Sequence, residues 1–172
     1  HILSHKQDAV YVAEVIAAWA ARYIDDTAAT DRPAPPVAAP ETVVVAETGE
    51  GSFAQAISVG GRHVLSADEP EDYGGADSGP SPYDFLLAGL GACTSMTMRM
   101  YARRKGLKLE QVAVTLRHDK VHAEDCTNCE TQSGKVDHIE RQIEITGDLT
   151  DEERGKLMEI ADKCPVHRTL HS

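Results

Sequence analysis

A stretch of apolar and small residues at positions 81–102, entered through Pro82, constrains the fold more than any other part of the chain. Bulky apolar side chains occupy nearly every side of its first half: Phe85, Leu86, Leu87, Leu90 and Met96. A helix that is apolar all round is typical of a protein core. We therefore predict one long core helix from Tyr83 to about Lys105, around which the other segments are arranged.

Cys93 lies in the middle of this predicted helix, next to four small residues: Ala88, Gly89, Gly91 and Ala92. Glycine inside a helix costs roughly 0.5–1 kcal/mol relative to alanine, so two glycines here indicate close packing of another backbone or access to the cysteine. A single helical cysteine is ordinarily a small buried apolar residue. From these residues alone, Cys93 is either a packing residue or a reactive thiol.

The segments on both sides of this helix have the alternation of strands. Three strands are predicted before it, at positions 42–48, 53–59 and 62–67, with glycine turns at 49–51 and 60–61. Two more strands follow the helix, at 112–122 and 139–145. A capping box at 150–153 then starts another helix. This order, which has no βαβ alternation, predicts an α+β fold.

The N-terminal part differs from the rest. Residues 4–24 form a predicted amphipathic helix whose apolar stripe is Val12, Val15, Ile16, Trp19 and Tyr23. Such a helix does not fold alone, so we expect it to dock on another surface. Residues 25–41 hold four prolines among Ala, Thr and Asp, which is typical of a semi-extended linker. We therefore expect three parts: a helix at 1–24, a linker at 25–41 and a folded domain at 42–172.

The composition argues against several classes of partner. With Lys+Arg 17 and Asp+Glu 28, the net charge of -11 disfavours nucleic acid and anionic membranes. Four cysteines are too few for a secreted disulfide scaffold, and no run of about 18 apolar residues predicts a membrane span. We therefore expect a cytoplasmic protein. The acidic run at 68–72 reads as a solvated loop, and a start without methionine suggests that the chain was cut.

Cys164 continues the apolar stripe of the helix that starts after position 150, and it stands directly before Pro165. Proline suits the first position of a helical turn, so Cys164 would lie at a helix N-terminus, where the dipole favours a thiolate. If this helix packs on the Cys93 helix, the two thiols could meet. A thiolate oxidised by a peroxide becomes a sulfenic acid, which a second thiol converts into a disulfide. Spacing alone leaves the contact open.

Two segments together, 81–93 and 161–167, resemble the paired cysteine motifs of the OsmC/Ohr family of thiol-dependent hydroperoxide reductases. The resemblance extends over about 41–172 in the same order of elements. It implies an OsmC-like fold, with antiparallel sheets wrapped around two central helices in an intertwined homodimer, here with an extra N-terminal helix. It also implies that Cys93 is the peroxidatic thiol and Cys164 the resolving thiol.

By this resemblance, we expect a peroxidase that reduces organic hydroperoxides in oxidative stress defence. A dithiol of the lipoyl or thioredoxin type would reduce the disulfide, and no metal or organic cofactor is required. The apolar residues around Cys93 favour alkyl or lipid peroxides over hydrogen peroxide. The alternative is a catalytically silent OsmC-like module that binds a ligand or has a structural role beside a hydrolase.

Two positions depart from the organic-peroxide branch of the family. That branch has a glutamate directly after the proline of the first motif, where Tyr83 stands here, and an arginine in the first hairpin, where residues 48–52 contain none. Arg62, after the second turn, is the nearest candidate for the arginine; its other interpretation is a solvated charge at a strand end. His167 is either a proton-transfer group beside Cys164 or a surface histidine.

The N-terminus resembles the end of an α/β-hydrolase domain, in which the triad histidine precedes the last helix and His1 has that position. The chain would then derive from a hydrolase–OsmC fusion. Because the nucleophile elbow and the triad acid are absent from this chain, His1 should be inert here.

A further motif, Cys126-Thr-Asn-Cys129, follows His122. With His118 or His138 as a further ligand it could bind zinc. Its two cysteines could instead form a redox-active loop disulfide, or they could be ordinary loop cysteines. The second half of a zinc finger is missing, and the three alternatives stay open.

Overall fold

A computed structural model describes residues 6–20, 36–122 and 135–170 of the chain, which forms two compact units, 1–36 and 37–172. The first unit contains α1 (Lys6–Ala20), the helix predicted from the apolar stripe. Three side chains of that stripe, Val15, Ile16 and Trp19, are exposed. The predicted cap at Ser4 and the helix end at 21–24 lie outside the described residues.

Three antiparallel strands begin the second unit: β1 (Val43–Glu47), β2 (Gln55–Val59) and β3 (His63–Ala67), in that order in the sheet. Each lies where the alternation predicts a strand. Gly60 and Gly61 join β2 to β3 with φ angles of 58° and 67°. The turn is closed by a hydrogen bond from the Arg62 N–H to the Val59 carbonyl at 3.1 Å, and its two central residues occupy the left-handed region, which glycine adopts without steric cost.

A buried carboxylate organises the loop between β3 and the long helix. Asp68 is 2% exposed, and it accepts hydrogen bonds from the N–H groups of Glu69, Ala76 and Ser78 at 2.9, 3.1 and 3.2 Å and from the Ser78 hydroxyl at 2.8 Å. The Ser78 hydroxyl is the main reason that the pKa of Asp68 lies below its ordinary value. The expectation of a solvated run at 68–72 is therefore wrong for Asp68, because the loop folds back on this side chain.

The predicted long helix is α2 (Pro82–Lys105). It begins with a capping box, in which Ser81 and Asp84 each accept a hydrogen bond from the other's exposed backbone N–H. It ends at Gly106, which has a φ of 67°. The residues of α2 that are buried are Leu90, Gly91, Thr94, Met98 and Ala102.

Another face of α2 is apolar and exposed. Met96 and Met100 are each 64% exposed, and Leu86 is 37% exposed. We call these three residues, with Gly89 and Ala92 between them, the α2 stripe. Within one chain, the prediction of a helix enclosed on every side is therefore wrong, because the chain covers the opposite face and leaves the α2 stripe in contact with solvent.

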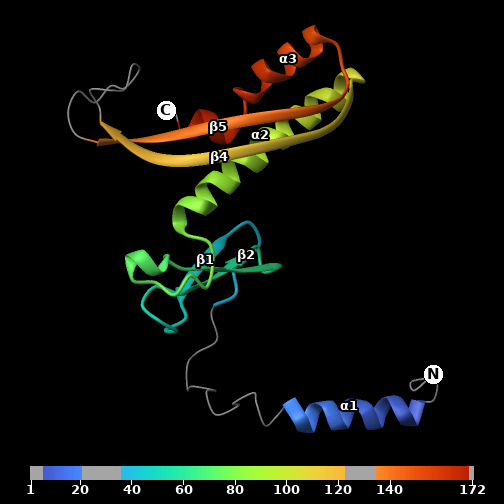
Figure 1. Ribbon diagram of the computed structural model, residues 1–172, viewed down its shortest axis with the longest axis vertical. Coiled ribbons are helices and arrows are strands. Elements are labelled where there is room, and N and C mark those ends of the chain that lie inside the picture. The colour runs from blue at the N-terminus through green and yellow to red at the C-terminus, as the bar shows by residue number, and fades with distance from the viewer. Residues whose placement is uncertain (1–5, 21–35, 123–134, 171–172) are drawn as a thin grey trace. The chain divides into compact units, whose positions relative to one another are not determined.

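A long hairpin packs against the buried face of α2 (Figure 1). It consists of β4 (Lys108–His122) and β5 (Lys135–Asp148), which pair antiparallel with an irregularity between Leu109 and Gln111. Both strands extend beyond the predicted 112–122 and 139–145, because the charged residues at their ends also pair across the hairpin.

Two helices complete the domain, α3 (Asp151–Ala161) and α4 (Pro165–Leu170). The predicted capping box between Thr150 and Glu153 starts α3, and Pro165 starts α4. The buried core joins α2, β4 and α3 through Met98, Ala102, Leu109, Leu157 and Ala161. Two antiparallel sheets with these helices confirm the predicted α+β class.

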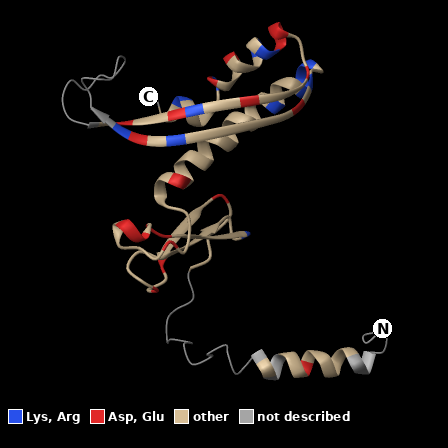
Figure 2. Cartoon of the chain, viewed as in Figure 1, with Lys and Arg blue, Asp and Glu red and all other residues tan. Residues whose placement is uncertain are grey.

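Charges are unevenly distributed over the second unit (Figure 2). Segment 37–81 contains acidic residues but a single Lys or Arg, which is Arg62, whereas blue positions recur on α2, the β4–β5 hairpin and α3. Arg62 is therefore the one Lys or Arg that the first sheet can offer to a site. No helix in the described part of the chain is both long and apolar enough to cross a bilayer.

Candidate functional site

Cys93 and Cys164 come together in the folded chain. Cys93 lies on α2, and Cys164 lies between α3 and α4, both of which pack on α2. The two side chains are free thiols, and the Cys93 thiol is close enough to Cys164 to lower the pKa of Cys164. The contact that the sequence left open is therefore made by the packing of three helices.

The two sulfurs differ in their access to solvent. Cys164 is fully buried, whereas Cys93 is partly exposed. A molecule that arrives from solvent therefore reaches Cys93 first. Cys93 also lies one helical turn from Met96 of the α2 stripe, so its exposed side has an apolar neighbour.

The surroundings of Cys164 favour its thiolate. Burial raises the pKa of Cys164, but hydrogen bonds from the Cys93 thiol, the His167 N–H, the Thr94 hydroxyl and the Val166 N–H together bring that pKa below its ordinary value. The bond from the His167 N–H to Cys164 Sγ is 3.4 Å long. His167 thus contributes its main chain to the sulfur, and proton transfer by its imidazole stays a prediction.

Sequence reasoning missed two residues that support the cysteine pair, Thr94 and Arg141. Thr94 is fully buried next to Cys93. Arg141, on β5, donates hydrogen bonds to Thr94 Oγ1 at 3.1 Å and to the Ala161 carbonyl at 3.3 Å, and it forms an ion pair with Asp162. One feature of the sequence could have identified Arg141. It lies on the less exposed face of β5, whose other residues include Ile139, Ile143 and Ile145. A charge in an apolar row indicates a buried partner.

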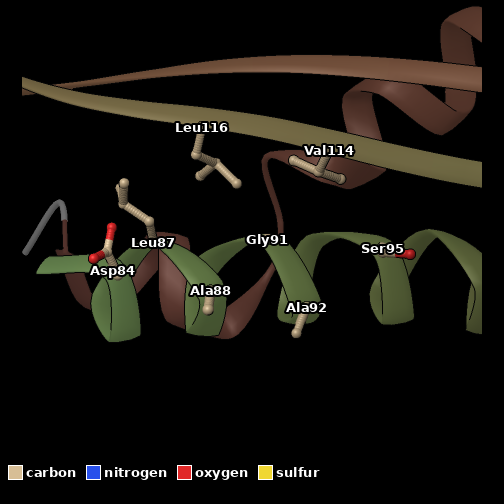
Figure 3. Close-up of a pocket in the computed structure, with 8 residues that line it drawn as sticks. All are labelled: Asp84, Leu87, Ala88, Gly91, Ala92, Ser95, Val114 and Leu116. Carbon is tan, nitrogen blue, oxygen red and sulfur yellow. The ribbon is translucent and has the colours of Figure 1, made fainter. Parts of the chain in front are cut away.

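A groove of about 410 Å³ lies between α2 and β4 (Figure 3). Its lining residues are Asp84, Leu87, Ala88, Gly91, Ala92, Ser95, Val114 and Leu116. Leu116 and Val114 reach from β4 toward the helix, and a Cβ on Gly91 would lie 2.8 Å from Leu116 Cδ1. Gly91 is therefore explained by the close approach of β4, whereas Gly89 has no neighbour within 4 Å of its Cβ position.

Tyr83, at the position where the resemblance expects glutamate, is engaged with the β4–β5 hairpin. Its ring stacks on His118 with centroids 4.0 Å apart and planes 11° from parallel. Its hydroxyl donates to Asp137 at 3.3 Å, and His118 Nε2 lies 2.8 Å from the same carboxylate oxygen. The hydrogen bond with His118 is the main cause that lowers the pKa of Asp137. The contacts among Tyr83, His118 and Asp137 therefore connect the start of α2 to the β4–β5 hairpin.

The other candidates are not brought to the cysteine pair. Arg62 lies in the turn between β2 and β3 with an exposed side chain, and among the described residues it has no hydrogen bond with either cysteine, so its catalytic role stays a prediction. His1 and the Cys126–Cys129 motif lie outside the described residues. Within the described ranges, no three His, Cys, Asp or Glu side chains are placed to hold a metal ion.

Comparisons with known proteins agree with this architecture. The family model described as OsmC-like protein matches residues 75–172. The crystal structure of an OsmC-like protein from Mycoplasma pneumoniae is 18% identical with a TM-score of 0.60, over 77% of this chain and 87% of that one. An organic hydroperoxide resistance protein OsmC from Legionella pneumophila is 22% identical with a TM-score of 0.55, over 75% and 88%.

An organic hydroperoxide resistance protein from Elizabethkingia anophelis is also similar, with 22% identity and a TM-score of 0.53 over 74% of this chain and 86% of that one. The search of curated proteins found no match. At these identities the structural likeness establishes the fold alone.

Proposed function

The chain belongs to the OsmC-like protein family, and from this premise we propose that it is a cysteine-based peroxidase that reduces organic hydroperoxides. The observation that carries the proposal is the contact between a partly exposed Cys93 and a buried Cys164 whose pKa is lowered. The names of the Legionella and Elizabethkingia proteins, which both refer to organic hydroperoxide resistance, support the same class of substrate.

The proposed reaction uses the two thiols in turn. The Cys93 thiolate attacks the terminal oxygen of the hydroperoxide, so that an S–O bond forms, the O–O bond breaks, and the alkoxide takes up a proton and leaves as an alcohol. The Cys164 thiolate then attacks the sulfur of the Cys93 sulfenic acid, an S–S bond forms, and hydroxide leaves with a proton as water. An external dithiol of the lipoyl or thioredoxin type supplies two electrons and restores both thiols.

We also propose that the working protein is a homodimer in which the α2 stripes of two copies face each other. Leu86, Met96 and Met100 are exposed in one chain, and contiguous apolar surface of this kind marks an interaction site. Gly89 and Ala92 are small enough for a second helix to approach. Such a partner would shield the exposed side of Cys93 and give it the apolar surroundings that suit an alkyl or lipid hydroperoxide.

A second candidate is a catalytically silent module that binds a ligand or has a structural role beside a hydrolase domain. It is favoured by Tyr83, which replaces the expected glutamate and whose ring and hydroxyl are taken up by His118 and Asp137. In this candidate Cys93 and Cys164 are packing residues, and neither reacts with hydroperoxide.

Mass spectrometry of the reduced chain after one equivalent of an organic hydroperoxide separates the two candidates. The peroxidase predicts a rapid loss of two hydrogen atoms from the chain, with the crosslink mapped to Cys93 and Cys164. A chain that stays reduced, or that forms a crosslink between Cys126 and Cys129 alone, contradicts the peroxidase and supports the silent module. A Cys126→Ser, Cys129→Ser variant is the matched control, since it removes the competing pair.

A further inference from the structure

An arginine on the inward side of β5 reaches the cysteine pair through one threonine. The Arg141 side chain is 13% exposed, although it stands in a row of isoleucines. Its partners surround the two thiols in sequence: Thr94 follows Cys93, and Ala161 and Asp162 come shortly before Cys164. The guanidinium therefore joins β5 to both chain segments that carry the cysteines.

The direction of these hydrogen bonds follows from the chemistry of the groups. Arginine has donors and no acceptor, so Thr94 Oγ1 is the acceptor in its 3.1 Å bond with Arg141. The hydroxyl proton of Thr94 is then available to another partner, and this hydroxyl is one of the groups that lower the pKa of Cys164. With its oxygen held by the guanidinium, Thr94 is left with a proton that it can donate to the Cys164 sulfur.

We propose that Arg141 is a positioning residue, which holds the Thr94 hydroxyl as a donor to Cys164 and so makes Cys164 the better leaving group of the disulfide. For its use in turnover, the inference rests on the proposed thiol chemistry. When a dithiol reduces the disulfide, its thiolate attacks the partly exposed Cys93. The S–S bond breaks, and the electron pair goes to Cys164 Sγ. The Thr94 hydroxyl and the His167 N–H then stabilise the Cys164 thiolate by donating hydrogen bonds to it. Thiols of lower pKa leave faster.

The test measures the thiolate of Cys164 without any peroxide. Cys93→Ser, Cys126→Ser and Cys129→Ser leave Cys164 as the single thiol, and its ultraviolet thiolate absorbance is followed against pH. Arg141→Met and Thr94→Val are each expected to raise the midpoint by about half to one unit. The double variant should rise no further than the larger single, because Arg141 acts through Thr94. Thr94→Ser keeps the hydroxyl and should keep the midpoint.

Arg154 provides the matched control. It donates to the carbonyls of Ile145 and Gly147 at 2.9 Å each, so Arg154→Met removes a structural arginine without touching the thiols and should leave the midpoint in place. If Arg141→Met does not fold, Arg141→Gln serves the same comparison, since its amide can still donate to the Ala161 carbonyl at the end of α3.

A second readout uses the chain with both thiols. After oxidation to the disulfide, reduction by dithiothreitol should slow on the order of threefold in Arg141→Met and Thr94→Val. An unchanged midpoint in Arg141→Met, additive shifts in the double variant, or an equal shift in Arg154→Met overturns the inference. A chain that consumes no hydroperoxide yet shows the expected midpoints contradicts the peroxidase and supports the inference.

Discussion

Cys93 and Cys164 are neighbours in the folded chain, yet their different exposure assigns them different steps in the proposed reaction. We expect Cys93→Ser to consume no organic hydroperoxide, because the buried sulfur is not reached from solvent. Cys164→Ser should consume one equivalent and stop at a Cys93 sulfenic acid, which dimedone labelling and peptide mass spectrometry would detect. Dimedone label on Cys164 in the Cys93→Ser variant would reverse the assignment.

A single carboxylate, that of Asp68, should make the free energy of unfolding depend on pH. Its folded-state pKa is lowered, first through the Ser78 hydroxyl, so its contribution to the free energy of unfolding is present above the ordinary value of 3.8 and is lost as pH falls through the lowered pKa. Urea unfolding at a series of acidic pH values should show a steeper loss of stability for the natural chain than for Asp68→Asn, which does not titrate.

If the free energy of unfolding fell equally steeply with pH in the natural protein and in Asp68→Asn, other carboxylates would be the cause of the acid sensitivity. Asp84 and Asp137 also have lowered pKa values, so Asp68→Asn is expected to reduce the slope without abolishing it. Ser78→Ala is the matched variant, because it removes the main cause of the shift and keeps the carboxylate.

At the scale of elements, the capping box of α2 sets where the cysteine helix begins. The Ser81 hydroxyl accepts from the Asp84 N–H at 3.3 Å, and Asp84 accepts in return from the Ser81 N–H at 2.9 Å. Loss of such a cap typically costs about 1 kcal/mol, so Ser81→Ala should lower the free energy of unfolding by about that amount in urea titrations. Ser52→Ala, in an exposed turn, is the control and should stay within about 0.5 kcal/mol of the natural chain.

The elements of the folded chain also show which parts of the molecule could be predicted from sequence. The strands and the helices α2 and α3 carry local signals, such as the alternation of β5 and the Thr150 capping box, and these elements lie where their signals are, although β4 and β5 are longer than predicted. Arg141 and Asp68 escaped prediction because their partners are distant: Arg141 meets Thr94 47 residues away, and Asp68 is buried only when its loop closes. The contact between the cysteines likewise depends on how α2, α3 and α4 pack.

At the scale of the whole molecule, the central question is what covers the α2 stripe. Sequence reasoning treated every apolar side of α2 as core, and one chain buries only part of it. The chain belongs to the OsmC-like family, yet Met96 and Met100 on its central helix are exposed. Both facts are explained if a second copy of the chain covers this face of α2 and completes the core. The apolar pattern then describes the dimer correctly and the single chain incompletely.

Light scattering on Met96→Lys tests this proposal. A lysine on the α2 stripe would place a charge between two apolar helices, which is costly without a partner, so we expect a dimer for the natural chain and a monomer for the variant. Met158→Lys is the matched control: Met158 is a 42% exposed methionine on α3, outside the α2 stripe, and its replacement should leave the dimer intact. In the monomeric variant, Cys93 should also react faster with an alkylating reagent, because no second α2 helix covers it. A natural chain that is already monomeric, or equal dissociation of both variants, would contradict the facing stripes.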